Sequence, residues 1–344
     1  MTTIVLFGGR SNERHVSVAS AQNVARALAN PLCWFWAPGG AVHDVSVAEL
    51  LAHQRPFERD FDPGRPAIFP DLEQALDTLP VEDPVFFLGL HGGEGEDGTV
   101  QAMMERRGIA FTGSGSRASA ASFDKGRAKQ VLEGKVRLAE SRSVAESDEP
   151  TVRSTVEWML ERHPKIVLKP LAAGSSRGLF FLEKGGDVDG VVRSVAKLKM
   201  PYIVEQFIAG RELTVGVVDN GDGPFALPVI EIVVDRGREF DYAGKYLGSG
   251  TQEICPADIP DAMRDAAQQT ALAAHQSLGC DGYSRSDVIG AHDGVYFLEI
   301  NTLPGLTISS LVPQELREAG IDFRTFLETQ IDLARQRVIA QAQT

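Results

Sequence analysis

The chain has 344 residues, more than one hydrophobic core usually serves, so two or three packed domains are expected. Hydrophobic residues make up 43% and charged residues 24%, and no apolar run is long enough to span a membrane. The net charge of -13 argues against general nucleic-acid binding, because phosphate contacts need clustered Lys and Arg. The three cysteines form no CxxC pair or Cys/His cluster, so neither a disulfide framework nor a zinc site is supported, and the cytoplasm is the expected compartment.

The N-terminal third predicts strands that end in glycine turns and lead into helices. Residues 3–8 predict a β-strand rather than a signal peptide, and a helix is expected over 15–30. A second strand is predicted over 85–93, followed by a helix over 99–108. This repetition indicates a parallel α/β layer, in which ligands bind at the carboxyl ends of the strands. Residues 31–72 are rich in proline and give no clear assignment.

The pattern then changes to short strands joined by short loops. Residues 165–170 and 179–184 flank a glycine/serine loop, which predicts an antiparallel hairpin. The remaining predicted elements are strands over 201–210 and 212–219, a helix over 260–278, a hairpin formed by 282–290 and 295–300, and a helix from 313.

The second hairpin carries the side chains with the clearest chemical meaning. Glu299 and Asn301 are two apart on a strand and share a face, and a turn near His292 brings Asp287 close to opposite Glu299. These oxygen ligands would converge without local Lys or Arg to neutralise them, although Arg285 is nearby. Hard oxygen ligands on a rigid sheet suit Mg²⁺, which commonly bridges nucleotide phosphates. The alternative is a solvated face with unrelated acids, but the apolar surroundings predict burial, and a buried acid pair needs compensation.

The glycine/serine loop at 172–178 is a candidate anion site. Its glycines let backbone N–H groups turn inward, Ser175 and Ser176 add hydroxyl donors, and Lys169 ends the preceding strand. A plain hairpin turn is the commoner explanation of such a loop. Two lysines from separate segments would each be ordinary surface charges when taken alone: Lys125 and Lys245.

Four further side chains are candidates by their position. Glu205 and Glu212 frame a strand with apolar neighbours that could hold a purine and its ribose, although a half-buried edge strand explains the pattern equally well. Glu13 and His91 follow the two predicted N-terminal strands, on the edge of the sheet where ligands bind. A lone histidine is more often a structural residue than a catalyst.

Together these segments resemble the D-alanine–D-alanine ligase family of the ATP-grasp superfamily. The stretches that carry the resemblance occur in the family's order and cover most of the chain outside roughly 31–80 and 135–160: LFGGRSNERHVS, LHGGEGEDGTVQ, FTGSGSRASAASFDK, IVLKPLAAGSSRG, VEQFIAGRELTV, DYAGKY, ICPA, GYSRSD and LEINTLPGLTISSLVP. The last stretch with the upstream SRSD is specific for this branch, whereas the GSS loop alone is not.

The resemblance implies an α/β fold, with an N-terminal Rossmann-like parallel sheet over 1–113 and a two-part ATP-grasp module over 114–204 and 205–344. It implies these ATP contacts: Lys125, Lys169 and Lys245 at the phosphates, Ser175 and Ser176 on a lid loop, Glu205 and Ile208 at the adenine, and Glu212 at the ribose. The implied ligands of two Mg²⁺ ions, with Mn²⁺ as an alternative, are Asp287, Glu299 and Asn301.

The resemblance also implies the substrate contacts. Those at the first amino acid are Glu13 at the ammonium and His91 nearby. Those at the second step are Arg285 and the Gly305 backbone at the tetrahedral oxyanion, and Ser310 and Leu311 at the second carboxylate. Tyr246 resembles a member of a hydrogen-bonded triad with Ser175 and Glu13, and it favours an amine as the second substrate.

The implied activity is ATP-dependent joining of two D-alanines through an acyl phosphate, for peptidoglycan precursors, by a homodimer. Water would destroy the acyl phosphate, so a closing loop is needed, and residues 235–250 have the glycines and the length for it. Two alternatives stay open: a relative that uses D-serine or another amino acid, and a nucleotide-binding regulator without turnover. A dehydrogenase is discounted because no GxGxxG is present.

Overall fold

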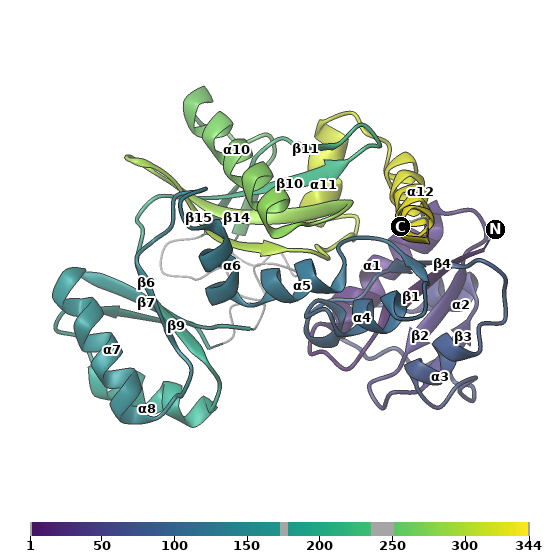
Figure 1. Cartoon of the computed structure of the whole chain (residues 1–344), viewed down its shortest axis with the longest axis horizontal. Helices are drawn as coiled ribbons and strands as arrows, with labels where there is room; N and C mark the ends of the chain where they lie inside the picture. The colour runs from purple at the N-terminus through teal and green to yellow at the C-terminus, as the bar shows by residue number, and fades with distance from the viewer. Residues whose placement is uncertain (1, 173–177, 235–250, 343–344) are drawn as a thin grey trace.

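The computed structural model describes residues 2–172, 178–234 and 251–342, which build three β-sheets with helices packed on them (Figure 1). The N-terminal sheet has the strand order β3-β2-β1-β4-β5, with β3 antiparallel and its other pairings parallel. Its strands are β1 (Thr3–Gly8), β2 (Leu32–Trp36), β3 (Val42–Val45), β4 (Val85–Leu88) and β5 (Ala110–Phe111). The parallel α/β layer is thereby confirmed.

The region without a clear assignment, 31–72, contains β2, β3 and the short helix α2 (Val47–Ala52). The strand predicted over 85–93 is therefore the fourth in the chain and ends at Leu88. Burial explains why β2 carries no alternating signal, because Cys33 to Trp36 are all buried on both faces, as in other parallel layers. The remaining N-terminal helices are α1 (Arg14–Ala27), α3 (Leu72–Asp77), the 3₁₀ turn η1 (Gly93–Gly95) and α4 (Thr99–Glu105).

A four-stranded sheet, ordered β6-β9-β7-β8, forms a separate unit at the lower left of Figure 1. Its strands are β6 (Ser141–Val144), β7 (Lys165–Pro170), β8 (Phe180–Glu183) and β9 (Tyr202–Gln206). Helices α7 (Glu149–Arg162) and α8 (Val188–Leu198) pack on it through a hydrophobic core of their own, built around side chains such as Val156 and Val192. The antiparallel hairpin of β7 and β8 is as predicted.

The third sheet has the order β13-β12-β10-β14-β15, with β11 paired to β10. Its strands are β10 (Arg211–Asp219), β11 (Pro224–Ala226), β12 (Ile230–Val234), β13 (Thr251–Ile254), β14 (Tyr283–Ala291) and β15 (Gly294–Asn301). Its helices are α5 (Ser116–Phe123), α6 (Lys125–Leu132), α10 (Asp261–Leu278) and α11 (Leu311–Glu318). The last helix, α12 (Phe323–Ala342), returns to the core of the N-terminal sheet through Phe326, Leu327 and Ile331.

A β-bulge interrupts the pairing of β14 with β15. Asp287 lies opposite Glu299, but the next pair is Val288 with Phe297, so Leu298 is the extra residue. Phe297 is fully buried against α10, whereas Glu299 two residues later is only partly buried and faces the other side of the sheet. The bulge therefore changes which positions of β15 point into the core.

None of the described helices is both long and apolar enough to cross a membrane. The division into domains at 1–113, 114–204 and 205–344 stays a prediction.

Candidate active site

The β14–β15 hairpin brings the two predicted metal-ligating carboxylates together. Asp287 and Glu299 are directly paired across the two strands. Thr214, on the neighbouring strand β10, donates its hydroxyl to Oδ1 of Asp287 at 2.7 Å. The carboxylate of Asp287 is buried. Its position is fixed by its own strand, β14, and by the hydrogen bond from Thr214 on β10.

The expectation that no local Lys or Arg neutralises these acids is wrong. The Arg285 guanidinium donates from Nε and Nη2 to the two carboxylate oxygens of Asp287, both at 2.9 Å. Nζ of Lys125, at the start of α6, lies 3.0 Å from Oε2 of Glu299. Arg285 lies two residues before Asp287 on β14, whereas Lys125 reaches Glu299 because α6 packs against β15, a contact that no local pattern predicts. Each carboxylate thus has a cation of its own.

The donor set still suits a hard cation. Two carboxylates and one amide offer the oxygen atoms that Mg²⁺ prefers. The amide nitrogen of Asn301 is buried and has no hydrogen-bond partner within the described ranges, so a half-turn of the amide would present its oxygen instead. In the part of the chain that the structure describes, no group of three or more His, Cys, Asp or Glu is placed so that it could hold a metal ion. Glu96, Lys125, Glu299 and Asn301 line one cavity, which joins the hairpin to the N-terminal sheet.

A buried ion triad lies on the small sheet. Glu205 on β9 is 3% exposed, and its two oxygens lie 2.6 Å from Nζ of Lys129 and 2.7 Å from Nζ of Lys169. Burial alone would raise the pKa of Glu205, but the charges of Lys169 and Lys129 outweigh it and hold that pKa below its usual value. Two predicted nucleotide contacts, Glu205 and Lys169, are therefore in direct contact. Lys129 was missed, although it lies four residues after Lys125 and so on the same face of α6.

The N-terminal half of the site gathers around two loops. Glu13 precedes α1, and a side chain on Gly92 would collide with its carboxylate, so the loops after β1 and β4 meet there. Nε2 of the buried His91 lies 3.0 Å from Oγ of Ser20 on α1. Nδ1 of His91 lies 3.8 Å from Oε1 of Glu96. Burial, with the nearby charge of Glu13, raises the pKa of Glu96.

The predicted oxyanion and second-substrate groups lie on the loop after β15. A Cβ on Gly305 would lie 2.8 Å from Oγ of Ser310, so only glycine fits without a shift. The Ser310 hydroxyl accepts from the N–H of Thr307 at 3.1 Å and lies 2.7 Å from its Oγ1. Ser310 is the N-cap of α11 and Leu311 its first residue. The free N–H groups at a helix start attract a carboxylate, which fits the predicted role.

Two of the remaining predicted residues lie on or next to β10, and the others lie outside the described residues. Ile208 lies in the connection from β9 to β10, and Glu212 lies on β10 opposite Ile289. Ser175, Ser176, Lys245, Tyr246 and the predicted closing loop 235–250 lie outside the described residues.

Glu315 on α11 is a buried acid that the sequence did not single out. Its Oε1 accepts from the N–H of Gly216 at 2.8 Å, and Gly216 is the β10 partner of Arg285. Burial raises the pKa of Glu315 well above its usual value. Nothing in the local sequence around α11 signals this contact, because it depends on how the helix crosses the sheet.

The fold has close counterparts among solved structures. The D-alanine-D-alanine ligase from Coxiella burnetii superimposes with a TM-score of 0.82 at 23% identity, covering 100% of this chain and 96% of that one. VanG D-Ala:D-Ser ligase from Enterococcus faecalis gives a TM-score of 0.78 at 25% identity, covering 97% and 99%. The three-sheet architecture, with acids and lysines meeting between its sheets, is that of the ATP-grasp ligases.

The sequence comparisons place the chain within that class. A model of the D-ala D-ala ligase N-terminus matches residues 2–114, and a model of the C-terminus matches residues 138–332. The D-alanine--D-alanine ligase of Desulfotalea psychrophila is 40% identical over 337 residues, 97% of this chain and 94% of that protein. The same-named protein of Syntrophobacter fumaroxidans is 35% identical over 336 residues, 97% of each. The chain belongs to the D-alanine–D-alanine ligase family.

Proposed function

We propose that the protein joins two D-alanines to D-alanyl-D-alanine at the expense of ATP. The observation that carries the proposal is the facing arrangement of a carboxylate pair, Asp287 and Glu299, with the cations of Arg285 and Lys125. Phosphoryl transfer needs this combination, because charge moves from the γ-phosphate to the leaving ADP and must be neutralised throughout. Synthesis of peptidoglycan precursors is the known role of the family, and we place the protein there, in the cytoplasm, as a homodimer.

In the first step, a carboxylate oxygen of the first D-alanine attacks the γ-phosphorus of ATP. The bond from that phosphorus to the bridging oxygen breaks, ADP leaves, and an acyl phosphate forms. Lys125 and Lys169 hold the phosphate oxygens, and Glu13 holds the substrate ammonium. Lys169 is paired with Glu205 in the described structure. Its ammonium has three donors, so it can hold a phosphate oxygen in addition to this carboxylate.

In the second step, the neutral amine of the second D-alanine attacks the acyl carbon. The negative charge that develops on the carbonyl oxygen is stabilised by the Arg285 guanidinium and the Gly305 backbone. The start of α11, at Ser310 and Leu311, holds the second carboxylate. The bond from carbon to the phosphate oxygen then breaks, phosphate leaves, and the amine gives up its proton.

Asp287, Glu299 and Asn301 would hold two Mg²⁺ ions, which supply charge neutralisation at the nucleotide phosphates when bound. Arg285 and Lys125, which now pair with the two carboxylates, are long enough to turn towards substrate groups instead. This chain therefore keeps its acids satisfied before any ligand arrives.

The proposal is tested by incubating the protein with ATP, Mg²⁺ and D-alanine and measuring released phosphate and the dipeptide. Phosphate and D-alanyl-D-alanine in equal amounts are expected. Turnover with another amino-acid pair, but none with D-alanine, would contradict the assignment.

A second candidate is a ligase that takes D-serine as its second substrate. The observation that favours it is the likeness to VanG, whose solved structure is that of a D-Ala:D-Ser ligase. Supplying D-alanine and D-serine together separates the candidates. Dominance of the mixed dipeptide in the product would favour the second candidate.

A further inference from the structure

Both backbone groups of a single loop residue, Leu306, are held by one helix of the N-terminal part. The N–H of Leu306 donates to Oγ of Ser20 at 3.1 Å. The side-chain amide of Asn23 donates to the carbonyl of Leu306 at 2.8 Å. Ser20 and Asn23 are three apart on α1 and therefore lie on the same face of that helix.

The contact lies beside the residues predicted to bind the oxyanion and the second carboxylate. Leu306 directly follows Gly305 and is separated by only three residues from Ser310. The loop is short and tied back on itself, since Thr307 and Ser310 exchange hydrogen bonds. A shift of Leu306 would therefore move the backbone at Gly305 and the start of α11 together.

The helix that holds Leu306 also carries the first-substrate half of the site. Glu13 is the N-cap residue of α1. The Ser20 hydroxyl lies 3.0 Å from Nε2 of His91, so one buried oxygen contacts both halves. Because Oγ accepts a hydrogen bond from the Leu306 N–H, its own O–H can donate a hydrogen bond to Nε2 of His91.

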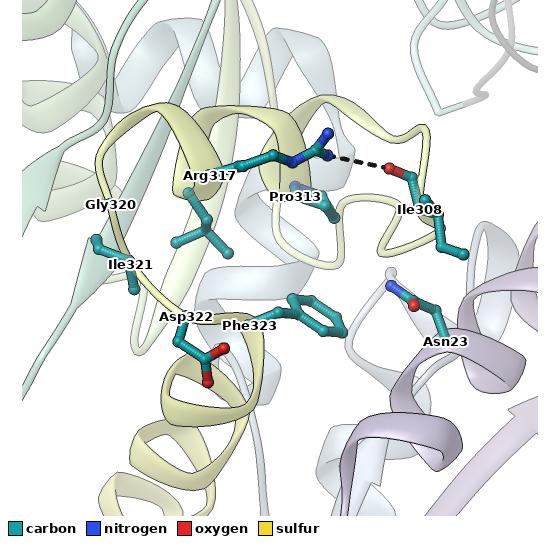
Figure 2. Close-up of a pocket in the computed structure, with 9 residues that line it drawn as sticks. Asn23, Ile308, Pro313, Arg317, Gly320, Ile321, Asp322 and Phe323 are labelled. Carbon is teal, nitrogen blue, oxygen red and sulfur yellow. Dashed lines mark hydrogen bonds between the residues drawn. The ribbon is translucent and has the colours of Figure 1, made fainter.

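Asn23 lies at the rim of this arrangement. Figure 2 shows Asn23 on α1 facing the segment that carries Ile308 and Pro313, across a groove of about 440 Å³. Its amide is half-buried, and Leu306 behind it is 2% exposed. The hydrogen bond to the Leu306 carbonyl is therefore shielded on one side from competing water.

We propose that Ser20 and Asn23 are positioning residues that fix the oxyanion and second-substrate loop relative to the first-substrate site. The inference rests on the proposed function for the roles of His91, Gly305 and Ser310. It adds that α1 sets the distance between the two half-sites, and that neither Ser20 nor Asn23 touches a substrate. The two amino acids must meet within bonding distance, so a small displacement of one half-site is costly.

The first test compares Ser20→Ala with Ser17→Ala. Ser17 is an equally buried serine one turn earlier on α1, but its hydroxyl bonds the backbone of Gly8 and Gly89 within the N-terminal sheet. Ser20→Ala should lower kcat for dipeptide formation on the order of 10- to 100-fold while the KM for ATP changes less than about twofold. Ser17→Ala should leave both values close to wild type.

The second test uses Asn23→Asp, which keeps the shape of the side chain but replaces the donor with a carboxylate that cannot donate to the Leu306 carbonyl. It should lower kcat by roughly tenfold and raise the KM for the second D-alanine. Because both side chains hold the same residue, the double variant should lose less than the product of the two single losses.

Amide hydrogen exchange separates this inference from the proposed function. Peptides that cover 303–310 should exchange faster in Ser20→Ala and Asn23→Asp than in wild type. In Ser17→Ala their exchange rate should equal that of wild type. Both expectations hold whichever amino acids are the substrates. Absence of wild-type turnover with D-alanine would count against the proposed function alone. Equal kcat for Ser20→Ala and Ser17→Ala, a loss confined to the KM for ATP, or unchanged exchange over 303–310 would each overturn the inference.

Discussion

Replacing Glu205 with glutamine removes the single carboxylate of the buried triad and leaves two lysines beside each other. The side chains of Glu205 and Lys129 are 4% and 6% exposed, and that of Lys169 is 13% exposed. Breaking a buried ion pair by removing one partner costs about 3 kcal/mol or more. With an unfolding entropy of about 2 cal/mol/K per residue, a chain of 344 residues should lose about 4 °C in Tm.

The assay is thermal unfolding followed by circular dichroism without nucleotide, with Glu183→Gln as the matched control. Glu183 lies on β8 of the same sheet and is paired with Lys165 at 3.1 Å, but its side chain is 70% exposed. An exposed pair of this kind contributes less than about 1 kcal/mol. The control should therefore melt within about 1 °C of wild type.

The two variants remove the same charge from the same sheet, so only burial and the second lysine distinguish them. If Glu205→Gln and Glu183→Gln melt at the same temperature, the argument that the triad needs its carboxylate is refuted. The double variant Lys129→Met with Glu205→Gln should recover part of the decrease in Tm, because it also removes one of the unpaired buried charges.

Three further predictions concern the hairpin, the loop and pH. Glu299→Gln should reduce phosphate release at least about 100-fold with an unchanged circular dichroism spectrum, and near-normal release would contradict its role as a metal ligand. Gly305→Ala should raise the KM for the second D-alanine about tenfold, because a Cβ there lies 2.8 Å from the Ser310 hydroxyl, and an unchanged KM would contradict this. Burial lowers the pKa of His275 to about 4, so only the unfolded chain takes up its proton below pH 6.5. The free energy of unfolding in urea should therefore fall by up to about 3 kcal/mol as pH drops from 6.5 towards 4, and His275→Gln should remove this dependence.

The sequence alone was sufficient to predict the elements that a short run of residues determines. Strand β1 follows from a short apolar run that ends in glycines, and the hairpin of β7 with β8 and the pairing of Asp287 with Glu299 follow from turn position. They are local features, so a pattern over a few residues determines them. The family's ordered motifs extended the prediction to the class of enzyme.

The sequence was insufficient where distant elements meet. The contact of Lys125 with Glu299 and the burial of Lys129 against Glu205 depend on α6 lying between two sheets. Strand β2 was missed because its five residues lie in a proline-rich stretch and lead into β3 rather than into a helix, as β1 does. The contact of Ser20 with Leu306 joins residues 286 positions apart and cannot be read from spacing.

The bulge at Leu298 makes β15 two segments in opposite phase. Val295 and Phe297 point into the core, and in a regular strand of the same sequence the same parity would send Glu299 and Asn301 there as well. Because the bulge absorbs Leu298, Ile300 takes the next core position and both polar side chains face the other way. Deleting Leu298 would place Glu299 directly after Phe297, so a regular strand would keep both side chains on their present face. Straightening the bulge with Leu298 retained would turn them inward without any change of amino acid, so the polar face of this strand depends on the pairing register as much as on residue type.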